Sequence, residues 1–429
     1  MILSASRRLR FTTFTLLYVA QGVPIGILDV AMPAWLAAQG YDAAAVGSFV
    51  AIVGLPWAFK LVAGPFMDRF GFPPMGRRRP WIMLAQGGLM LMLVLLALVP
   101  DPASQLGMLM AVGFLVNACA ATQDVAVDGM AIDILPFAER GRANAFMAFG
   151  QVGGIAGTGV VAAYLLANFG LVATGLAAAL TIGAIFSMVV ISLERPGERR
   201  LPWSSGLPHP EAEGLSPTLG RLFTDLRRAL LLPMSLVITA SVFLVRVAMG
   251  AFLAATPVFA VQELGFEAEV YSRNYGTLIG VCAVFGLLVG PLVDRFGARQ
   301  VLLAALVVGA TLLASFSLLP GLWGNDRYLF AMLAAYLLVE QVIFVCLIAQ
   351  YMNLTWQKVA ATQFAVYMAL ANLGRSTGAG LSAALSVELD FASLFLVFAG
   401  LYLLSFACLL AFREPRHLRD LESLGEASS

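Results

Sequence analysis

The chain has 429 residues, of which 60% are hydrophobic and 12% are charged, and its mean hydropathy is +0.88. A soluble domain carries about 25% charged residues, so this composition excludes an ordinary water-soluble protein and indicates that lipid is the main solvent. The net charge is +1, and the arginines gather beside apolar runs, which argues against a nucleic-acid partner.

Apolar runs long enough to cross a bilayer follow one another along the chain. A spanning helix needs roughly 20 apolar residues. The predicted spans are 11–36, 45–67, 81–99, 106–134, 142–168, 171–193, 230–262, 272–293, 300–319, 328–353, 361–386 and 391–412. The sequence therefore predicts an all-α membrane protein with twelve transmembrane helices.

One long polar segment, 194–229, divides these spans into two sets of six. We interpret it as a cytoplasmic linker between an N-terminal bundle, 1–193, and a C-terminal bundle, 230–412. The polar tail, 413–429, is expected to be mobile. Most of the 26 basic residues fall in segments that the positive-inside rule assigns to the cytoplasm, together with both termini.

A repeated octapeptide indicates that the two bundles are homologous. Gly-Pro-Phe-Met-Asp-Arg-Phe-Gly at 64–71 recurs as Gly-Pro-Leu-Val-Asp-Arg-Phe-Gly at 290–297. Two pseudo-symmetric six-helix bundles in tandem are the architecture of a secondary transporter. We expect the charged residues of both copies, Asp68, Arg69, Asp294 and Arg295, to close a cytoplasmic gate. The alternative is a simple turn flanked by positive-inside arginines.

Ionisable residues inside the spans are candidates for function, because a charge at mid-membrane must face a cavity or another charge. Asp124 and Asp128 are four residues apart and project from one helical face, with Gln123 beside them. We interpret this group, with Asp29 and Glu340, as a site for protons or a cationic substrate. A structural network of ion pairs with Lys60 or the arginines is the alternative. His209 lies in the linker and His417 in the tail, so proton coupling must use carboxylates.

Three basic residues within spans, Lys60, Arg246 and Arg375, are candidates for substrate binding. Guanidinium groups bind carboxylates in a bidentate geometry, which favours an anionic substrate. Salt bridges to Glu340 or Asp29 are the competing structural role. The four cysteines fall in four different spans without metal-ligand spacing, so we predict no metal and no cofactor.

Glycines and prolines interrupt the first and seventh spans at corresponding places. Gly22, Pro24 and Gly26 occupy the first span, and Gly250 and Pro257 occupy the seventh. Such interruptions either flank a central site or serve kinking and close packing. The five glycines of the fifth span are interpreted as a close helix contact: Gly150, Gly153, Gly154, Gly157 and Gly159.

Several longer motifs stand in and between the spans. They are Leu-Pro-Trp-Ala-Phe-Lys at 55–60, Gly-Pro-Phe-Met-Asp-Arg at 64–69, Gly-Arg-Arg-Arg-Pro-Trp at 76–81, Ala-Thr-Gln-Asp-Val-Ala-Val-Asp at 121–128, Leu135-Pro136 with Glu139-Arg140-Gly141, and Ala-Thr-Gln-Phe-Ala at 361–365 through Asn372-Leu373-Gly374-Arg375. Together they resemble the AmpG-type branch of the major facilitator superfamily, also called the peptide/acetyl-CoA transporter family. The resemblance covers nearly the whole chain.

This resemblance implies proton-driven import across the bacterial cytoplasmic (inner) membrane by alternating access. AmpG proteins carry anhydro-muropeptides, and relatives carry siderophores such as pyochelin or rhizobactin, or acyl-CoA. The transport residues it implies are Lys60, Gln123, Asp124, Asp128 and Arg375, with Asn372 as a further substrate-binding candidate. AmpG proteins usually have two further helices, a difference that favours the shorter siderophore-type relatives.

Two other classes compete with a transporter. A membrane enzyme would need a nucleophile–base pair or a metal constellation, and the sequence offers neither. A channel or a non-transporting scaffold is the second rival. We therefore expect a carrier, not an enzyme, that acts as a monomer in the lipid bilayer on a small-molecule substrate and protons.

Overall fold

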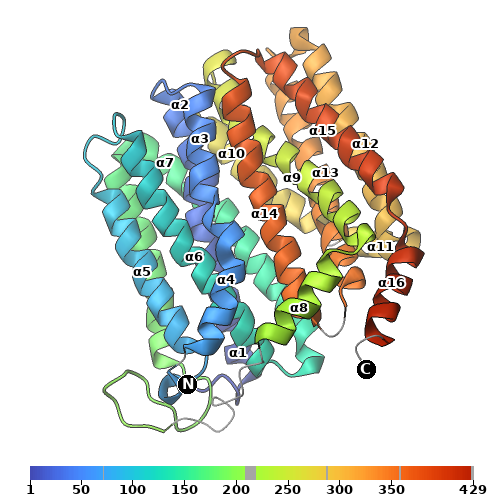
Figure 1. The fold of residues 1–429 in the computed structure, drawn as a ribbon. Coiled ribbons are helices and arrows are strands. Elements are labelled where there is room, and N and C mark those ends of the chain that lie inside the picture. The colour runs from blue at the N-terminus through green and yellow to red at the C-terminus, as the bar shows by residue number, and fades with distance from the viewer. Residues whose placement is uncertain (71, 208–218, 287, 357–358, 427–429) are drawn as a thin grey trace. The chain divides into compact units, whose positions relative to one another are not determined.

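The computed structural model describes residues 1–70, 72–207, 219–286, 288–356 and 359–426 (Figure 1). Nine helices in these ranges are long and apolar enough to cross a membrane. One of them, α7 (Phe137–Ile191), contains two predicted spans. Two predicted spans remain. The span 272–293 coincides with α10 (Ala268–Gly286) and α11 (Val289–Phe296), and the span 361–386 coincides with α14 (Ala360–Leu385). The predicted all-α membrane fold is confirmed.

The chain forms two compact units. Unit 1 comprises Met1–Gln39, Phe59–Ser216 and Ala268–Gly280, and unit 2 comprises Gly40–Ala58, Pro217–Glu267 and Val281–Ser429. Unit 1 holds most of the first sequence half together with Ala268–Gly280 from the second half. Unit 2 holds most of the second half together with Gly40–Ala58 from the first half. The bundle boundaries expected from the sequence, 1–193 and 230–412, stay predictions.

Unit 1 is built around long helices of the first sequence half. Besides α7 and the first part of α10 it contains α1 (Arg7–Ile25), η1 (Gly26–Ala31), α2 (Met32–Ala38), most of α4 (Pro56–Arg69), η2 (Pro73–Met75), α5 (Arg79–Ala97) and α6 (Leu106–Ile134). The chain reverses within α7 at Gly170, whose φ of 76° lies in the left-handed region that glycine adopts without strain.

Unit 2 contains most helices of the second sequence half. These are α8 (Leu219–Leu230), α9 (Pro233–Val258), η4 (Phe259–Glu263), α11, α12 (Ala298–Leu318), η5 (Pro320–Leu322), α13 (Asp326–Leu354), α14, α15 (Phe391–Ala411) and α16 (Glu414–Glu426), joined by α3 (Ala43–Gly54) from the first half.

The interruptions predicted for the first and seventh spans are π-helical turns. η1 begins two residues after Pro24, and η4 begins two residues after Pro257. The wider register lies beyond the proline: the Met32 N–H after η1 donates to the Ile27 carbonyl, five residues back. The same irregularity at the same place in both halves agrees with the duplication, and it puts Asp29 within a π-turn.

Most of the polar tail is helical, and its expected mobility stays a prediction. Residues 414–426 form α16, which buries Leu421 in a cluster with Ala229, Trp356 and Val359. His417 is also buried, and its Nε2 lies 2.8 Å from the carbonyl oxygen of Leu354. An amphipathic helix of this length can pack on a bundle even though it is too polar to span a membrane.

Candidate functional site

The interior of unit 1 contains a partly buried ion pair between two predicted site residues. The Lys60 Nζ lies 2.8 Å from the Asp124 Oδ2. The other carboxylate oxygen of Asp124 accepts a hydrogen bond from the side-chain amide of Gln21. Because an unpaired charge is costly at this depth, these two partners satisfy the Asp124 carboxylate.

Asp128 lies one helical turn further along α6 and has a different partner. Its carboxylate accepts a hydrogen bond from the hydroxyl of Tyr18 on α1. The Asp128 side chain is exposed on the surface of the chain, whereas Asp124 is buried. Asp124 therefore has a cation beside it, and Asp128 has a neutral hydroxyl beside it.

Three glutamines hold this cluster in place. Gln151 on α7 donates from its Nε2 to the Oε1 of Gln21 at 2.7 Å, which leaves the Gln21 amide nitrogen to donate to Asp124. Gln123 is fully buried and donates to the Leu17 carbonyl at 2.8 Å. The sequence analysis missed Gln21 and Gln151. The signal that could have found them is a lone amide side chain in an apolar span, next to the glycines of the contact between α1 and α7.

Close packing of α1 on α7 creates this geometry. A Cβ atom added at Gly22 would lie 2.5 Å from the Gln151 carbonyl oxygen, and one added at Gly154 would lie 2.5 Å from the Val19 carbonyl oxygen. Only glycine allows two backbones to come this near. The predicted contact is confirmed for Gly150, Gly154 and Gly159, but Gly153 and Gly157 have no atom within 4 Å of an added Cβ.

Unit 2 holds a second polar cluster, on α9, α13 and α15. The carboxylate of Glu340 accepts a hydrogen bond from the Tyr402 hydroxyl, which lies 3.2 Å from the hydroxyl of Tyr336. The Tyr336 ring stacks on Phe252 with ring centroids 3.8 Å apart. Arg246 is buried, and its Nε has no hydrogen-bond partner among the described residues. That N–H is suited to donate to an anion.

Glycines bring Arg246 and Arg375 to adjoining turns of two helices. A Cβ added at Gly250 on α9 would lie 1.9 Å from the Arg375 carbonyl oxygen. One added at Gly374 on α14 would lie 3.2 Å from the Cβ of Arg246. This backbone contact corresponds to the one between α1 and α7 in unit 1, since α9 and α14 are the first and fifth spans of the second half.

The other predicted site residues lie elsewhere. Asp29 is buried in η1, roughly two turns beyond Gln21 along the same span. Asn372 donates to the Trp57 carbonyl at 3.2 Å within unit 2. The Arg295 guanidinium is exposed and lies 5.2 Å from the centre of the Phe296 ring. The side chains of Asp68, Arg69 and Asp294 lie outside the described residues.

The arginines that follow the first octapeptide form hydrogen bonds with backbone carbonyls and with a carboxylate of unit 1. The Arg79 guanidinium is buried and donates to the carbonyls of Val189, Val190, Arg199 and Arg200 at 2.6–3.0 Å. The Glu194 carboxylate accepts from the backbone N–H groups of Arg77 and Arg78 at 3.0 and 2.8 Å. These contacts fasten the start of α5 to the end of α7 and the beginning of the linker, and sequence reasoning did not predict them.

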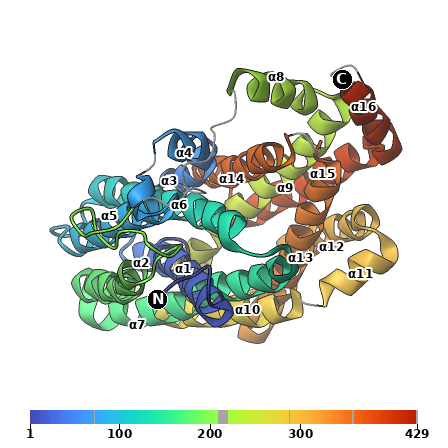
Figure 2. The ribbon, with the colours of Figure 1, turned by 90° about the horizontal axis from the view of Figure 1, so that it is seen from below.

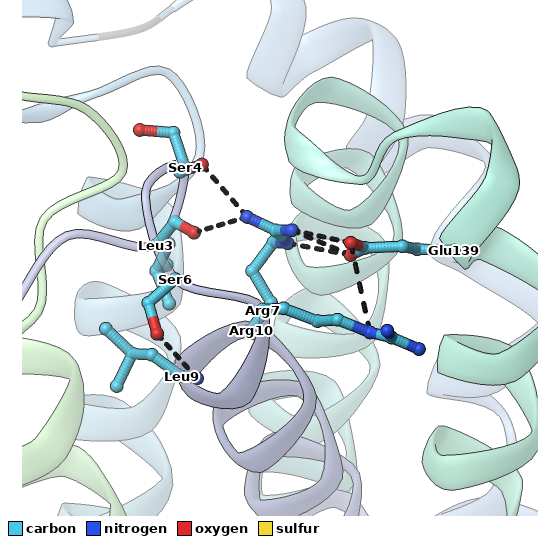
Figure 3. Close-up of polar contacts among 7 residues, drawn as sticks. All are labelled: Leu3, Ser4, Ser6, Arg7, Leu9, Arg10 and Glu139. Carbon is cyan, nitrogen blue, oxygen red and sulfur yellow. Dashed lines mark hydrogen bonds and ion pairs between the residues drawn. The ribbon is translucent and has the colours of Figure 1, made fainter.

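The N-terminal arm is fastened to the same unit through Arg10. Its guanidinium forms a two-pronged ion pair with Glu139 at 2.8–3.0 Å and also donates to the carbonyls of Leu3 and Ser4 (Figure 3). The Leu3 N–H in turn donates to the Leu193 carbonyl at 2.8 Å. Bidentate arginine–carboxylate contacts fix geometry strongly, so the first residues, α1 and the start of α7 are held together.

Clusters of histidine, cysteine and acidic residues that could bind a metal ion are absent from the part of the chain that the structure describes. The chemistry of both polar clusters is instead that of carboxylates, an ammonium, guanidinium groups and hydroxyls. Such groups bind and release protons and anions, but they form no nucleophile–base arrangement of a hydrolytic enzyme.

The chain is similar in sequence to bacterial permeases and transporters. The chain is 28% identical over 378 residues to the anhydromuropeptide permease of Escherichia coli K12, an alignment that covers 85% of this chain and 72% of the permease. It is 29% identical over 154 residues to the putative transporter AmpG 4 of Rickettsia conorii, covering 35% of this chain and 36% of that protein.

Solved structures share the fold at low sequence identity. A D-xylose–proton symporter matches with a TM-score of 0.71 and 14% identity over 94% of this chain and 97% of the symporter. The nucleoside transporter NupG matches with a TM-score of 0.65 and 14% identity, over 94% of this chain and 98% of that one. The model of the family described as Major Facilitator Superfamily matches residues 14–379. The chain therefore belongs to the major facilitator superfamily and is a membrane transporter, not an enzyme.

Proposed function

We propose that this protein imports an anhydro-muropeptide or a related anionic, amphipathic solute across the bacterial inner membrane, in symport with protons. The observation that supports this most directly is the pair of carboxylates Asp124 and Asp128, one paired with Lys60 and the other hydrogen-bonded to the Tyr18 hydroxyl. The 28% identity to an anhydromuropeptide permease over most of the chain supports the substrate class.

The different partners of the two carboxylates support the proposed proton coupling. Asp124 is neutralised by Lys60, so loading a proton there requires the ion pair to open. Asp128 can accept a proton directly, since its partner Tyr18 is a neutral donor. Protonation of Asp128 removes one of two negative charges on adjacent turns of α6 and so relieves their repulsion. Binding or loss of a proton at Asp128 therefore changes the net charge of the polar cluster in unit 1.

Anion binding is proposed for the guanidinium groups of unit 2. Arg246 and Arg375 lie on adjoining turns of α9 and α14, and the buried Nε of Arg246 has a hydrogen to donate. A muropeptide bears carboxylates that match bidentate donors. A siderophore acid or an acyl-CoA also bears anionic groups, so these are the competing substrates.

The test is uptake by right-side-out vesicles from a host that lacks its own anhydromuropeptide permease. Vesicles containing this protein should accumulate labelled anhydro-muropeptide when the outside is acidified, and a protonophore should abolish the accumulation. Counterflow of labelled against unlabelled substrate should persist, because a carrier exchanges substrate whereas a channel does not. Accumulation of a siderophore or acyl-CoA with no muropeptide uptake would replace the proposed substrate, and uptake that is insensitive to the protonophore would reject the coupling.

A further inference from the structure

The short helix α8 has a surface that the transport function does not use. It ends at Leu230, and α9 begins three residues later at Pro233. Because α9 is a membrane span, this connection leaves α8 no freedom to move away from the membrane surface where α9 starts. Figures 1 and 2 show α8 across that end of unit 2, near α16.

One face of α8 is anchored to unit 2. Ala229 is fully buried against Trp356, Val359 and Leu421, and the partly buried Leu232 and Leu424 pack on the same cluster. Leu226, three residues before Ala229, is also buried. The helix is therefore a preformed surface held by α16 and by the segment before α14.

A neighbouring face of α8 combines an exposed aromatic ring with arginines. Phe223, Arg227 and Leu230 are four and three residues apart and share one side of the helix. The Phe223 side chain is 58% exposed, Leu231 is 60% exposed, and Arg227 and Arg228 are both exposed. Apolar groups beside cations at the level of a membrane surface match the layer in which acyl chains meet charged headgroups.

We propose that α8 is a docking site for anionic phospholipid. The phenyl ring of Phe223 and the leucines enter the acyl boundary, and Arg227 and Arg228 bind the phosphates of the headgroups. Arginine is suited to this contact because its guanidinium donates to two phosphate oxygens at once. Each basic residue near an anionic surface contributes a preference of about fivefold, so the two arginines together should prefer anionic over zwitterionic lipid roughly 25-fold.

The experiment places a fluorescent probe on α8 and measures which lipid lies beside it. The four native cysteines are replaced by serine, the exposed neighbour of Phe223 is changed by Thr224→Cys and labelled with a nitrobenzoxadiazole group, and the full chain is reconstituted in nanodiscs. The discs contain phosphatidylcholine and phosphatidylglycerol, and one of the two lipids bears a nitroxide at the same acyl carbon. Spin-labelled phosphatidylglycerol should quench the probe more strongly, with an apparent preference of roughly 25-fold.

Arg227→Gln with Arg228→Gln should remove this preference, so that the two lipids quench equally. The matched control, Arg273→Gln with Arg327→Gln, removes the same charge from two exposed arginines on other helices and should retain it. An unchanged elution volume identifies folded variants. Equal quenching by both lipids with α8 intact would overturn the proposal, and so would an absence of quenching by either lipid.

Discussion

At the scale of single residues, the two neighbouring carboxylates of α6 differ in what they contact. Asp124 contacts the Lys60 ammonium and the Gln21 amide, whereas Asp128 contacts a tyrosine hydroxyl. Both residues are one turn apart on the same helix, so their different roles arise from α1 and α4, not from α6 itself.

Asp128→Asn should abolish proton-driven accumulation and leave counterflow exchange intact, because the amide keeps the hydrogen bond to Tyr18 but binds no proton. Asp124→Asn should also abolish accumulation while the protein stays folded and inserted. Uptake driven by a pH gradient into proteoliposomes, compared with counterflow, measures this. Asp101→Asn, at an exposed loop position, is the control. If uphill uptake persists in both variants, the carboxylate pair is structural and Glu340 becomes the next candidate.

Arg375→Ala should weaken binding of an acidic substrate at least tenfold, since losing one partner of a buried charged contact costs roughly 2–5 kcal/mol. Arg375→Lys should restore binding only in part, because an ammonium cannot reproduce the two-pronged geometry. Direct binding to the purified protein is compared for the acid and for its amide or ester. Equal binding of the neutral derivative, together with a silent Arg375→Ala, would show that the arginine is structural.

At the scale of elements, glycine contacts hold corresponding helix pairs in both halves: α1 on α7, and α9 on α14. The tightest of these contacts are in unit 2, where Cβ atoms added at Gly250 and Gly378 would lie 1.9 Å from carbonyl oxygens. Helices in lipid gain little from burying apolar surface against each other, so van der Waals contact between close backbones is the main source of their association.

Gly378→Ala should therefore destabilise the protein, because its methyl group overlaps the Val247 carbonyl and overpacking costs about 1–3 kcal/mol. Gly380→Ala, two positions away on α14, is the matched control, since its added methyl would be 3.8 Å from the Ala51 Cβ, an ordinary contact. Thermal unfolding in detergent measures both. Equal melting temperatures for the two variants would contradict the close-packing interpretation.

The linker that follows α7 contains a carboxyl group that titrates near neutrality. Burial raises the pKa of Glu198 to about 7, and its Oε2 accepts from the Arg195 N–H at 3.0 Å. The folded segment binds this proton more tightly than the unfolded chain does. The stability it contributes is therefore fully present below the ordinary glutamate pKa and is lost as pH rises through about 7.

Amide exchange of residues 195–207 should accordingly be faster at pH 8 than at pH 6, after correction for the intrinsic exchange rate. A difference of one pKa unit corresponds to about tenfold in the opening equilibrium, so a change of roughly tenfold or more is expected. Glu198→Gln, which cannot ionise, should exchange at the same corrected rate at both pH values. A pH-dependent rate that survives in this variant would assign the effect to Glu194, whose pKa burial also raises.

At the scale of the whole molecule, the first part of span 2 packs with the second sequence half. A Cβ added at Gly47 on α3 would lie 2.9 Å from the Cβ of Ala383 on α14, and one added at Gly54 would lie 2.8 Å from the Ser376 hydroxyl. If transport proceeds by alternating access, this contact must open once in every cycle, because it joins residues from the two sequence halves.

A disulfide across this contact should stop transport. With the native cysteines replaced, Gly47→Cys and Ala383→Cys bring two Cβ atoms nearer than the roughly 3.5–4.5 Å of a disulfide, so the two helices must separate slightly to form it. Oxidation should block counterflow, and reduction should restore it. The control is Ser241→Cys with Ser405→Cys, whose native hydroxyls lie 3.0 Å apart on α9 and α15. Those two helices belong to one sequence half, so their crosslink should leave exchange intact. Exchange that continues through the oxidised Gly47–Ala383 pair would contradict alternating access at this contact.

The sequence by itself determined the spans, the duplication and the family, since apolar runs, a recurring octapeptide and branch-specific motifs are local properties of the chain. It also indicated which spans contain ionisable residues. The partners of those residues were decided by tertiary structure. Gln21 and Lys60 reach Asp124 from 103 and 64 residues away, and the carbonyls that receive Arg79 lie 110–121 residues along the chain. Hydropathy indicates that a charge inside the membrane needs a partner, but which partner it meets depends on how closely glycine allows two helices to pack.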